Sequence, residues 1–142
     1  MGRYTDLIPK IEASGTEYFK QEFGEPERRL VPLKEINKIR KEFPGIPEDF
    51  LDYLLEVGEG CIGDMLCDIF IPRRLKEMHD EDHIDVEIDL TTNLVCFYAD
   101  DDAFAAFLPD DGWKIVNAYH AFSEIEPSVR NSFEEYIRAM AS

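Results

Sequence analysis

The sequence lacks the features that mark membrane, secreted and disulfide-rich proteins. No apolar run approaches the roughly 20 residues that a membrane-spanning helix needs. Residues 1–6 lack the apolar core of a signal peptide. The three cysteines, Cys61, Cys67 and Cys96, are odd in number and have apolar neighbours, which favours free buried thiols over a disulfide framework. We therefore expect a soluble cytoplasmic protein with no membrane partner.

Motifs of the common enzyme classes are missing as well. The chain has no Gly-x-Ser-x-Gly, no Walker loop and no dinucleotide fingerprint. Cys61 and Cys67 have the wrong spacing for a zinc knuckle. His79 and His83 are the best metal candidates, because two imidazoles one helical turn apart can chelate an ion, but no third or fourth ligand can be named. We predict no metal, no cofactor and no enzymatic activity, and keep a hydrolase built on the two histidines as an alternative.

Basic residues are scarce and unevenly spread. The 142 residues include 31 acidic and 15 basic side chains, a net charge of −16. Residues 1–60 contribute −4 (13 acidic, 9 basic), and residues 61–142 contribute −12 (18 acidic, 6 basic). Residues 77–111 hold twelve carboxylates and no Lys or Arg. Such a surface repels nucleic acid and anionic lipid and speeds the approach of a basic protein. The alternative is that the acidic balance only keeps the protein soluble.

What the sequence does contain is a set of amphipathic helices. Apolar residues at helical spacing predict helices at about 3–13, 32–43, 47–57 and 128–140. In the third, Pro47 suits the first helical position, acidic residues follow it, and Gly58 and Gly60 can turn the chain at the end. The apolar stripes predicted for the second and last helices are Leu33, Ile36, Ile39 and Phe43, and Val129, Phe133, Tyr136, Ile137 and Met140.

Between the third helix and the last, the pattern is that of strands. Residues 84–90 alternate strictly between apolar and acidic side chains, which predicts a half-buried strand with an acidic outer face. Apolar runs predict further strands at 64–71, 94–98, 103–108 and 113–119, and short connections make the strands from residue 84 onward antiparallel neighbours. This order predicts one α+β domain over residues 1–142, with helices packed on one side of an antiparallel sheet meander and a C-terminal helix.

Three stretches follow the pattern of a known family. Residues 46–54 (Ile-Pro-Glu-Asp-Phe-Leu-Asp-Tyr-Leu) run into a glycine-containing turn, residues 96–107 form an Asp-rich hairpin, and residues 133–137 read Phe-Glu-Glu-Tyr-Ile. Together they resemble the SUKH superfamily, which includes Smi/Knr-type cell-wall assembly regulators and bacterial immunity proteins. The chain departs from the family pattern at residues 57–60, where Asn-Gly-Gly is usual, and at Asp102 and Ala103, where the hairpin turn usually has glycines.

The resemblance covers residues from about 32 to 140 and has consequences for fold and function. It implies a single α+β domain with a curved antiparallel sheet and no enzymatic activity. In bacteria it implies a protein that binds and neutralises a cognate toxin, often a nuclease.

Charge and resemblance lead to our first hypothesis, a non-enzymatic immunity-type protein that occludes a basic, nuclease-like toxin domain. A nuclease site must attract phosphate and is therefore cationic, so an acidic surface is its electrostatic complement. We expect a protein partner and no nucleic acid. The residues expected to form the surface are Asp85, Glu87, Asp89, Asp100, Asp101 and Asp102.

A second hypothesis is a regulatory scaffold or small-ligand-binding module of the same fold. Trp113, Tyr98 and Tyr119 could line a pocket on a concave sheet face, although all three suit a core equally well. Converging polar groups in such a pocket would favour this hypothesis.

Overall fold

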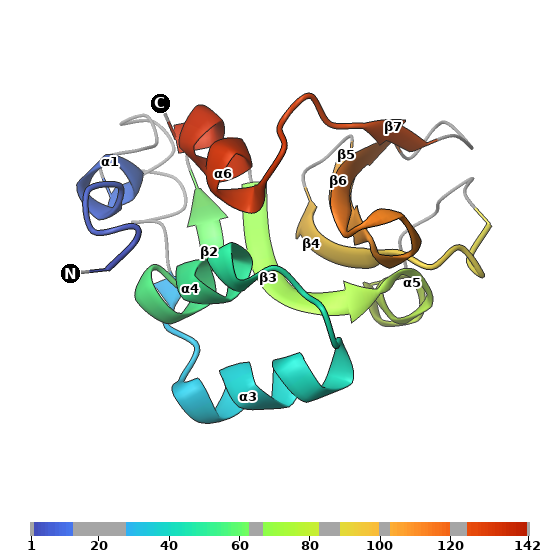
Figure 1. Ribbon diagram of the computed structural model, residues 1–142, viewed down its shortest axis with the longest axis horizontal. Coiled ribbons are helices and arrows are strands. Elements are labelled where there is room, and N and C mark those ends of the chain that lie inside the picture. The colour runs from blue at the N-terminus through green and yellow to red at the C-terminus, as the bar shows by residue number, and fades with distance from the viewer. Residues whose placement is uncertain are drawn as a thin grey trace.

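The computed structural model describes residues 2–12, 28–62, 67–82, 89–99, 103–119 and 125–141, which combine helices with one antiparallel sheet (Figure 1). This confirms the α+β class and the C-terminal helix. In the described ranges, no helix is both long and apolar enough to cross a bilayer. The elements are α1 (Ile8–Glu12), β1 (Arg28–Arg29), α3 (Leu33–Glu42), α4 (Glu48–Glu56), β2 (Glu59–Ile62), β3 (Cys67–Arg74), α5 (Leu75–Asp82), β4 (Val95–Ala99), β5 (Ala103–Leu108), the 3-10 helix η1 (Pro109–Asp111), β6 (Lys114–Tyr119), β7 (Ile125–Pro127) and α6 (Phe133–Ala141).

The sheet is a meander of seven strands in the order β1-β2-β3-β4-β5-β6-β7, and each strand is antiparallel to the next. The register shifts between Ile69 and Arg73 where β3 meets β4, and between Cys96 and Tyr98 where β4 meets β5. Such irregularities bend a strand and increase its twist. The sheet is accordingly curved, and β3 bends along its length in Figure 1.

The strands predicted at 94–98, 103–108 and 113–119 are confirmed to within one residue at each end. The strand predicted at 64–71 corresponds to β3, which begins and ends three residues later in the sequence. It runs to Arg74 and includes Pro72. β1, β2 and β7 were not predicted, and β7 extends the meander by one strand beyond Tyr119.

The strand predicted at 84–90 is wrong for residues 89 and 90. Its predicted position beside the strand at 94–98 is also wrong. β4 pairs directly with β3, so no strand separates them. Asp89 and Leu90 belong to no strand, since the backbone N–H and the hydroxyl of Thr91 both donate to Oδ1 of Asp89, at 2.9 and 2.8 Å. This local turn competes with strand pairing, as Asp side chains commonly do. Residues 84–88 lie outside the described residues.

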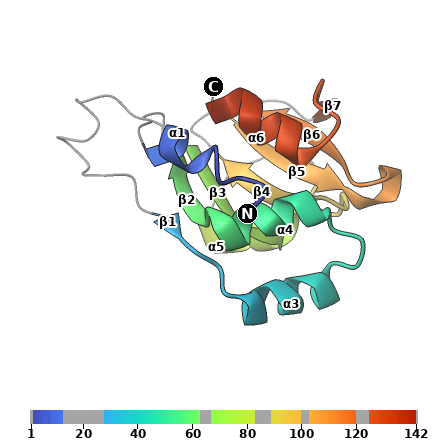
Figure 2. The same cartoon turned by 60° about the vertical axis from the view of Figure 1, so that its left-hand side comes forward.

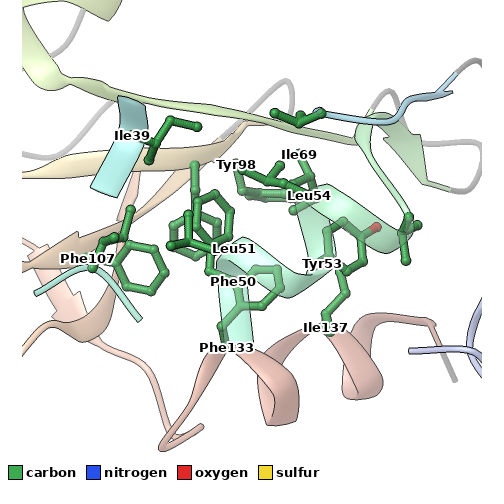
Figure 3. Close-up of a cluster of buried hydrophobic side chains, with 14 of the residues drawn as sticks. Ile39, Phe50, Leu51, Tyr53, Leu54, Ile69, Tyr98, Phe107, Phe133 and Ile137 are labelled. Carbon is green, nitrogen blue, oxygen red and sulfur yellow. The ribbon is translucent and has the colours of Figure 1, made fainter. Parts of the chain in front are cut away.

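The main core lies between the sheet and four helices, α1, α3, α4 and α6. Phe50 of α4 is at its centre, with ring centroids 5.6 Å from Phe97, 5.3 Å from Phe107 and 5.0 Å from Phe133 (Figure 3). α4 lies between α3 and α6 (Figure 1). These contacts confirm that the helices at 32–43 and 47–57 share one core.

A second, smaller core covers the opposite face of the sheet. Leu75 and Met78 of α5 pack there against Leu94 and Cys96. The prediction that helices lie on one side of the sheet is therefore wrong for α5. The reason is that α5 continues directly from β3 and presents Leu75 and Met78, three residues apart, to the side of the sheet that the other helices leave uncovered.

The first residue of each of two predicted apolar stripes, those of the second and last helices, is exposed and not buried. Leu33 is 57% exposed and Val129 is 86% exposed. Leu33 is the first residue of α3, and Val129 precedes α6, which begins at Phe133 instead of residue 128. Ser132 sets this start, because its Oγ accepts the backbone N–H of Glu135 at 3.2 Å and so caps the helix.

Candidate functional site

The predicted acidic surface is described at one residue only. Asp89 is exposed, and the two hydrogen bonds from Thr91 hold the pKa of its carboxyl below the usual range, so it is ionised at neutral pH. Asp85, Glu87, Asp100, Asp101 and Asp102 lie outside the described residues. That the six form one surface stays a prediction.

Other carboxylates from residues 77–111 are carried by α5 and η1. Glu77, Asp80 and Glu81 belong to α5, and Asp110 and Asp111 belong to η1. The amide of Asn93 donates to Oδ1 of Asp110 at 3.2 Å and joins the segment after Asp89 to η1. Leu90, Leu108 and the residues of α5 contribute to the same apolar cluster. Glu77, Asp80 and Glu81 thus belong to the helix that covers the sheet face opposite the main helices (Figure 1).

Several carboxylates on the helical side form ion pairs with arginines. Arg3 contacts Asp52 and Glu134, both at 3.0 Å, and Arg138 contacts Asp6 at 2.7 Å and Glu134 at 2.9 Å. The two guanidinium groups hold the pKa of Glu134 below its usual range. The other close pairs on this side are Arg29–Glu35 (3.0 Å), Arg29–Glu59 (2.7 Å) and Arg40–Glu48 (2.8 Å).

Fewer carboxylates are matched on α5 and η1. Glu81 pairs with Arg73 at 3.3 Å and Asp111 with Lys114 at 2.6 Å, while Glu77 forms no ion pair with a described residue. Exposed pairs of this kind contribute little stability. The ion pairs are nevertheless unevenly distributed. Within the described part of the chain, more of them involve carboxylates of the helical side than carboxylates of α5 and η1.

The histidines and cysteines considered for chemistry form no metal cluster within the described residues. Nδ1 of His79 lies 3.2 Å from Asp80 Oδ1, and His83 is outside the described ranges. No three His, Cys, Asp or Glu side chains in those ranges are placed to hold a metal ion. Cys96 is buried, and burial raises the pKa of its thiol to about 12, so the nucleophilic thiolate is scarce at neutral pH.

The three aromatic residues considered for a ligand pocket are separated in the structure. Tyr98 is 7% exposed and belongs to the main core, whereas Tyr119 is 40% exposed at the end of β6. Trp113 lines a small pocket of about 170 Å³ that we call the Arg74 pocket. Its lining residues are Glu42, Phe43, Pro44, Arg74, Asn93, Val95, Pro109 and Trp113.

Sequence reasoning missed the Arg74 pocket because four separate segments form it. They are the end of α3, the end of β3, the residues before β4 and the turn between β5 and β6. The register of the sheet brings them together, since Arg74 is paired with Val95. The one local signal was Gly45, which ends a helix in the sequence and contacts Trp113 in the structure.

A comparison of the chain with protein-family models, with curated proteins and with solved structures gave no match.

Proposed function

We propose that the chain is a non-enzymatic immunity-type protein that binds and neutralises a cognate, basic, nuclease-like toxin domain. It acts in the cytoplasm and needs no cofactor. The observation that carries the proposal is the uneven charge: residues 61–142 hold −12 of the total −16, and arginines offset the described carboxylates mainly on the helical side.

The family resemblance supports the same function. Its hallmark, residues 46–54, contains most of α4, the helix at the centre of the main core. An α+β domain with a curved antiparallel sheet is also what the resemblance implies. Because the apolar residues of this stretch are buried, they bear on the fold, and the choice of partner falls to the surface charges.

The acidic surface acts chiefly on the rate of association. Complementary charge raises association rates by roughly 10- to 1,000-fold, and the gain falls as salt screens it. Single exposed charges add little affinity. A basic toxin domain would therefore be captured quickly, with buried contacts at the interface setting how long the complex lasts.

Charge reversal of Asp85 and Glu87 to lysine tests this role. The association rate constant with the proposed basic toxin domain, to be sought in the gene next to that of this chain, is expected to fall about tenfold at low salt and to depend less on salt. Asp89 is left intact because its carboxylate holds the turn at Thr91.

The matched control reverses Glu42 and Glu126, which are exposed and form no ion pair with a described residue. Both double variants change the net charge by the same amount. An equal slowing in the two would mean that only the total charge matters. An unchanged rate in the Asp85/Glu87 variant would remove the acidic surface from the account.

One observation favours the second candidate function, a regulatory scaffold or ligand-binding module. Trp113 lines the Arg74 pocket together with two side chains of opposite charge, Arg74 and Glu42. This pocket lies at the end of α3.

A further inference from the structure

Arg74 is held in place but is not neutralised. Its guanidinium carbon lies 5.0 Å from the centre of the Phe43 ring, a cation–π contact. The side chain is exposed and forms no ion pair with a described residue, although most arginines of the described chain do. A guanidinium stacked on a ring keeps its N–H edge free to donate two parallel hydrogen bonds to a carboxylate.

Trp113 forms another wall of the pocket in an unusual backbone conformation. Its φ of 61° lies in the left-handed region, which a bulky residue enters at a cost. Its indole lies against Gly45, where an added Cβ would be 2.7 Å from Nε1. Gly45 thus leaves room for the ring, and Phe43 and Trp113 give the cationic pocket apolar sides. The volume of about 170 Å³ suits a single side chain or chain end.

Three lysines lie on the outer face of α3, the helix whose C-terminal end borders this pocket. Lys34, Lys38 and Lys41 are spaced to lie on one face of the helix, all are exposed, and none pairs with a described carboxylate. α3 lies at the edge of the molecule (Figures 1 and 2), so this face is open. Leu33, the first residue of α3, is exposed as well. In a chain of net charge −16 this is a local cationic surface.

We propose that the Arg74 pocket and the lysine face of α3 bind an acidic, extended peptide segment of a partner protein. Arg74 anchors one carboxylate of the segment between Phe43 and Trp113. Lys34, Lys38 and Lys41 contact the acidic residues that follow. The lysine face carries charge of the opposite sign to the acidic surface proposed for the toxin complex, so it serves a second partner.

A nucleic acid fits these observations less well. Tight binding to a polyphosphate requires many cations along its path, and the strong negative charge of the rest of the chain opposes it. Glu42 also lines the pocket and repels a chain of phosphates more than it repels one carboxylate that is held by two hydrogen bonds. The apolar walls match the carbon atoms of a Glu side chain or of a C-terminal residue.

Trp113 is the only tryptophan and reports directly on the pocket. The probe is a short synthetic peptide of alternating glutamate and leucine with a free C-terminal carboxylate. Titrating it into the full chain at low salt is expected to change Trp113 fluorescence with saturation. The same peptide with glutamine for glutamate and an amidated end is expected to leave the fluorescence unchanged. Saturation by both peptides, or by neither at millimolar concentration, would overturn the proposal.

The Arg74→Met variant isolates the anchor. It keeps an apolar chain over Phe43 and removes the charged donors, so the peptide is expected to bind about tenfold more weakly. Arg130→Met is the matched control, because Arg130 is also exposed, pairs with no described carboxylate and lies beside α6 in another hollow. Arg74→Lys is expected to fall between the wild type and Arg74→Met, since an ammonium cannot form the two parallel bonds. An equal loss in Arg74→Met and Arg130→Met would overturn the proposal.

Replacing Lys34, Lys38 and Lys41 with glutamine tests the lysine face. Peptide affinity is expected to fall and to become less sensitive to salt, while the fluorescence change at saturation stays the same because the anchor is intact. Unaltered affinity would remove the lysines from the site. A single-stranded oligonucleotide of equal charge is the competing probe, and if it binds more tightly than the peptide the assignment to an acidic polypeptide is wrong.

Discussion

Replacing Phe50 with alanine is expected to lower the free energy of unfolding by about 3–5 kcal/mol, as truncation of a fully buried phenylalanine typically does. Phe50 is inaccessible to solvent and packs its ring against Phe97, Phe107 and Phe133. The substitution removes these contacts and leaves a cavity where α4, α6 and the sheet meet. Domains are stable by roughly 5–15 kcal/mol, so one such change removes much of the total.

Urea denaturation followed by circular dichroism measures this loss. The matched control is Leu55→Ala on the same helix, because Leu55 is 38% exposed and is expected to cost about 1 kcal/mol or less. Equal losses in the two variants would mean that the main core is not centred on α4.

Replacing Gly58 with alanine is expected to have a comparably large effect. The φ of Gly58 is 99°, a conformation that costs other residues about 1–2 kcal/mol. An added Cβ would also meet the carbonyl oxygen of Arg29 and lie 2.6 Å from its carbonyl carbon. These are backbone atoms of β1, so relief requires shifting the strand that pairs with β2. We expect a total loss of about 2–5 kcal/mol in the free energy of unfolding.

Gly112→Ala separates the two contributions. Gly112 also has a positive φ, 68°, but an added Cβ would have no atom within 4 Å. This variant should lose only the conformational contribution, about 1–2 kcal/mol. Thermal or urea unfolding of both variants measures the difference. If Gly58→Ala is no more destabilised than Gly112→Ala, the close approach of β1 to Gly58 is not a constraint.

The sequence predicted those elements whose signals are local. α4 was located from its proline, its acidic first turn and the glycines after it, and Gly58 and Gly60 do adopt positive φ. β5 was located from an apolar run bounded by turn residues. In each case the residues that define the element lie within a dozen positions of one another, so the pattern is complete without knowledge of the fold.

Elements whose structure depends on distant partners were missed or misplaced. β1 has two residues and exists because it pairs with β2 about thirty positions later. The side of the sheet on which α5 lies depends on what the other helices already cover, which no local pattern states. The alternation at 84–90 failed at Asp89, where a side-chain hydrogen bond to Thr91 forms a turn. The Arg74 pocket likewise arises from the sheet register and from four segments that carry no shared pattern.

The central claim is that the chain neutralises a basic toxin domain by binding it. It is tested most directly by titrating the nuclease activity of the proposed cognate toxin domain, to be sought in the gene next to that of this chain, with the purified protein. The account predicts that activity falls in proportion to added protein and is abolished at one equivalent, more readily at low salt than at high salt. Full activity in the presence of a large excess, at any salt concentration, would contradict it.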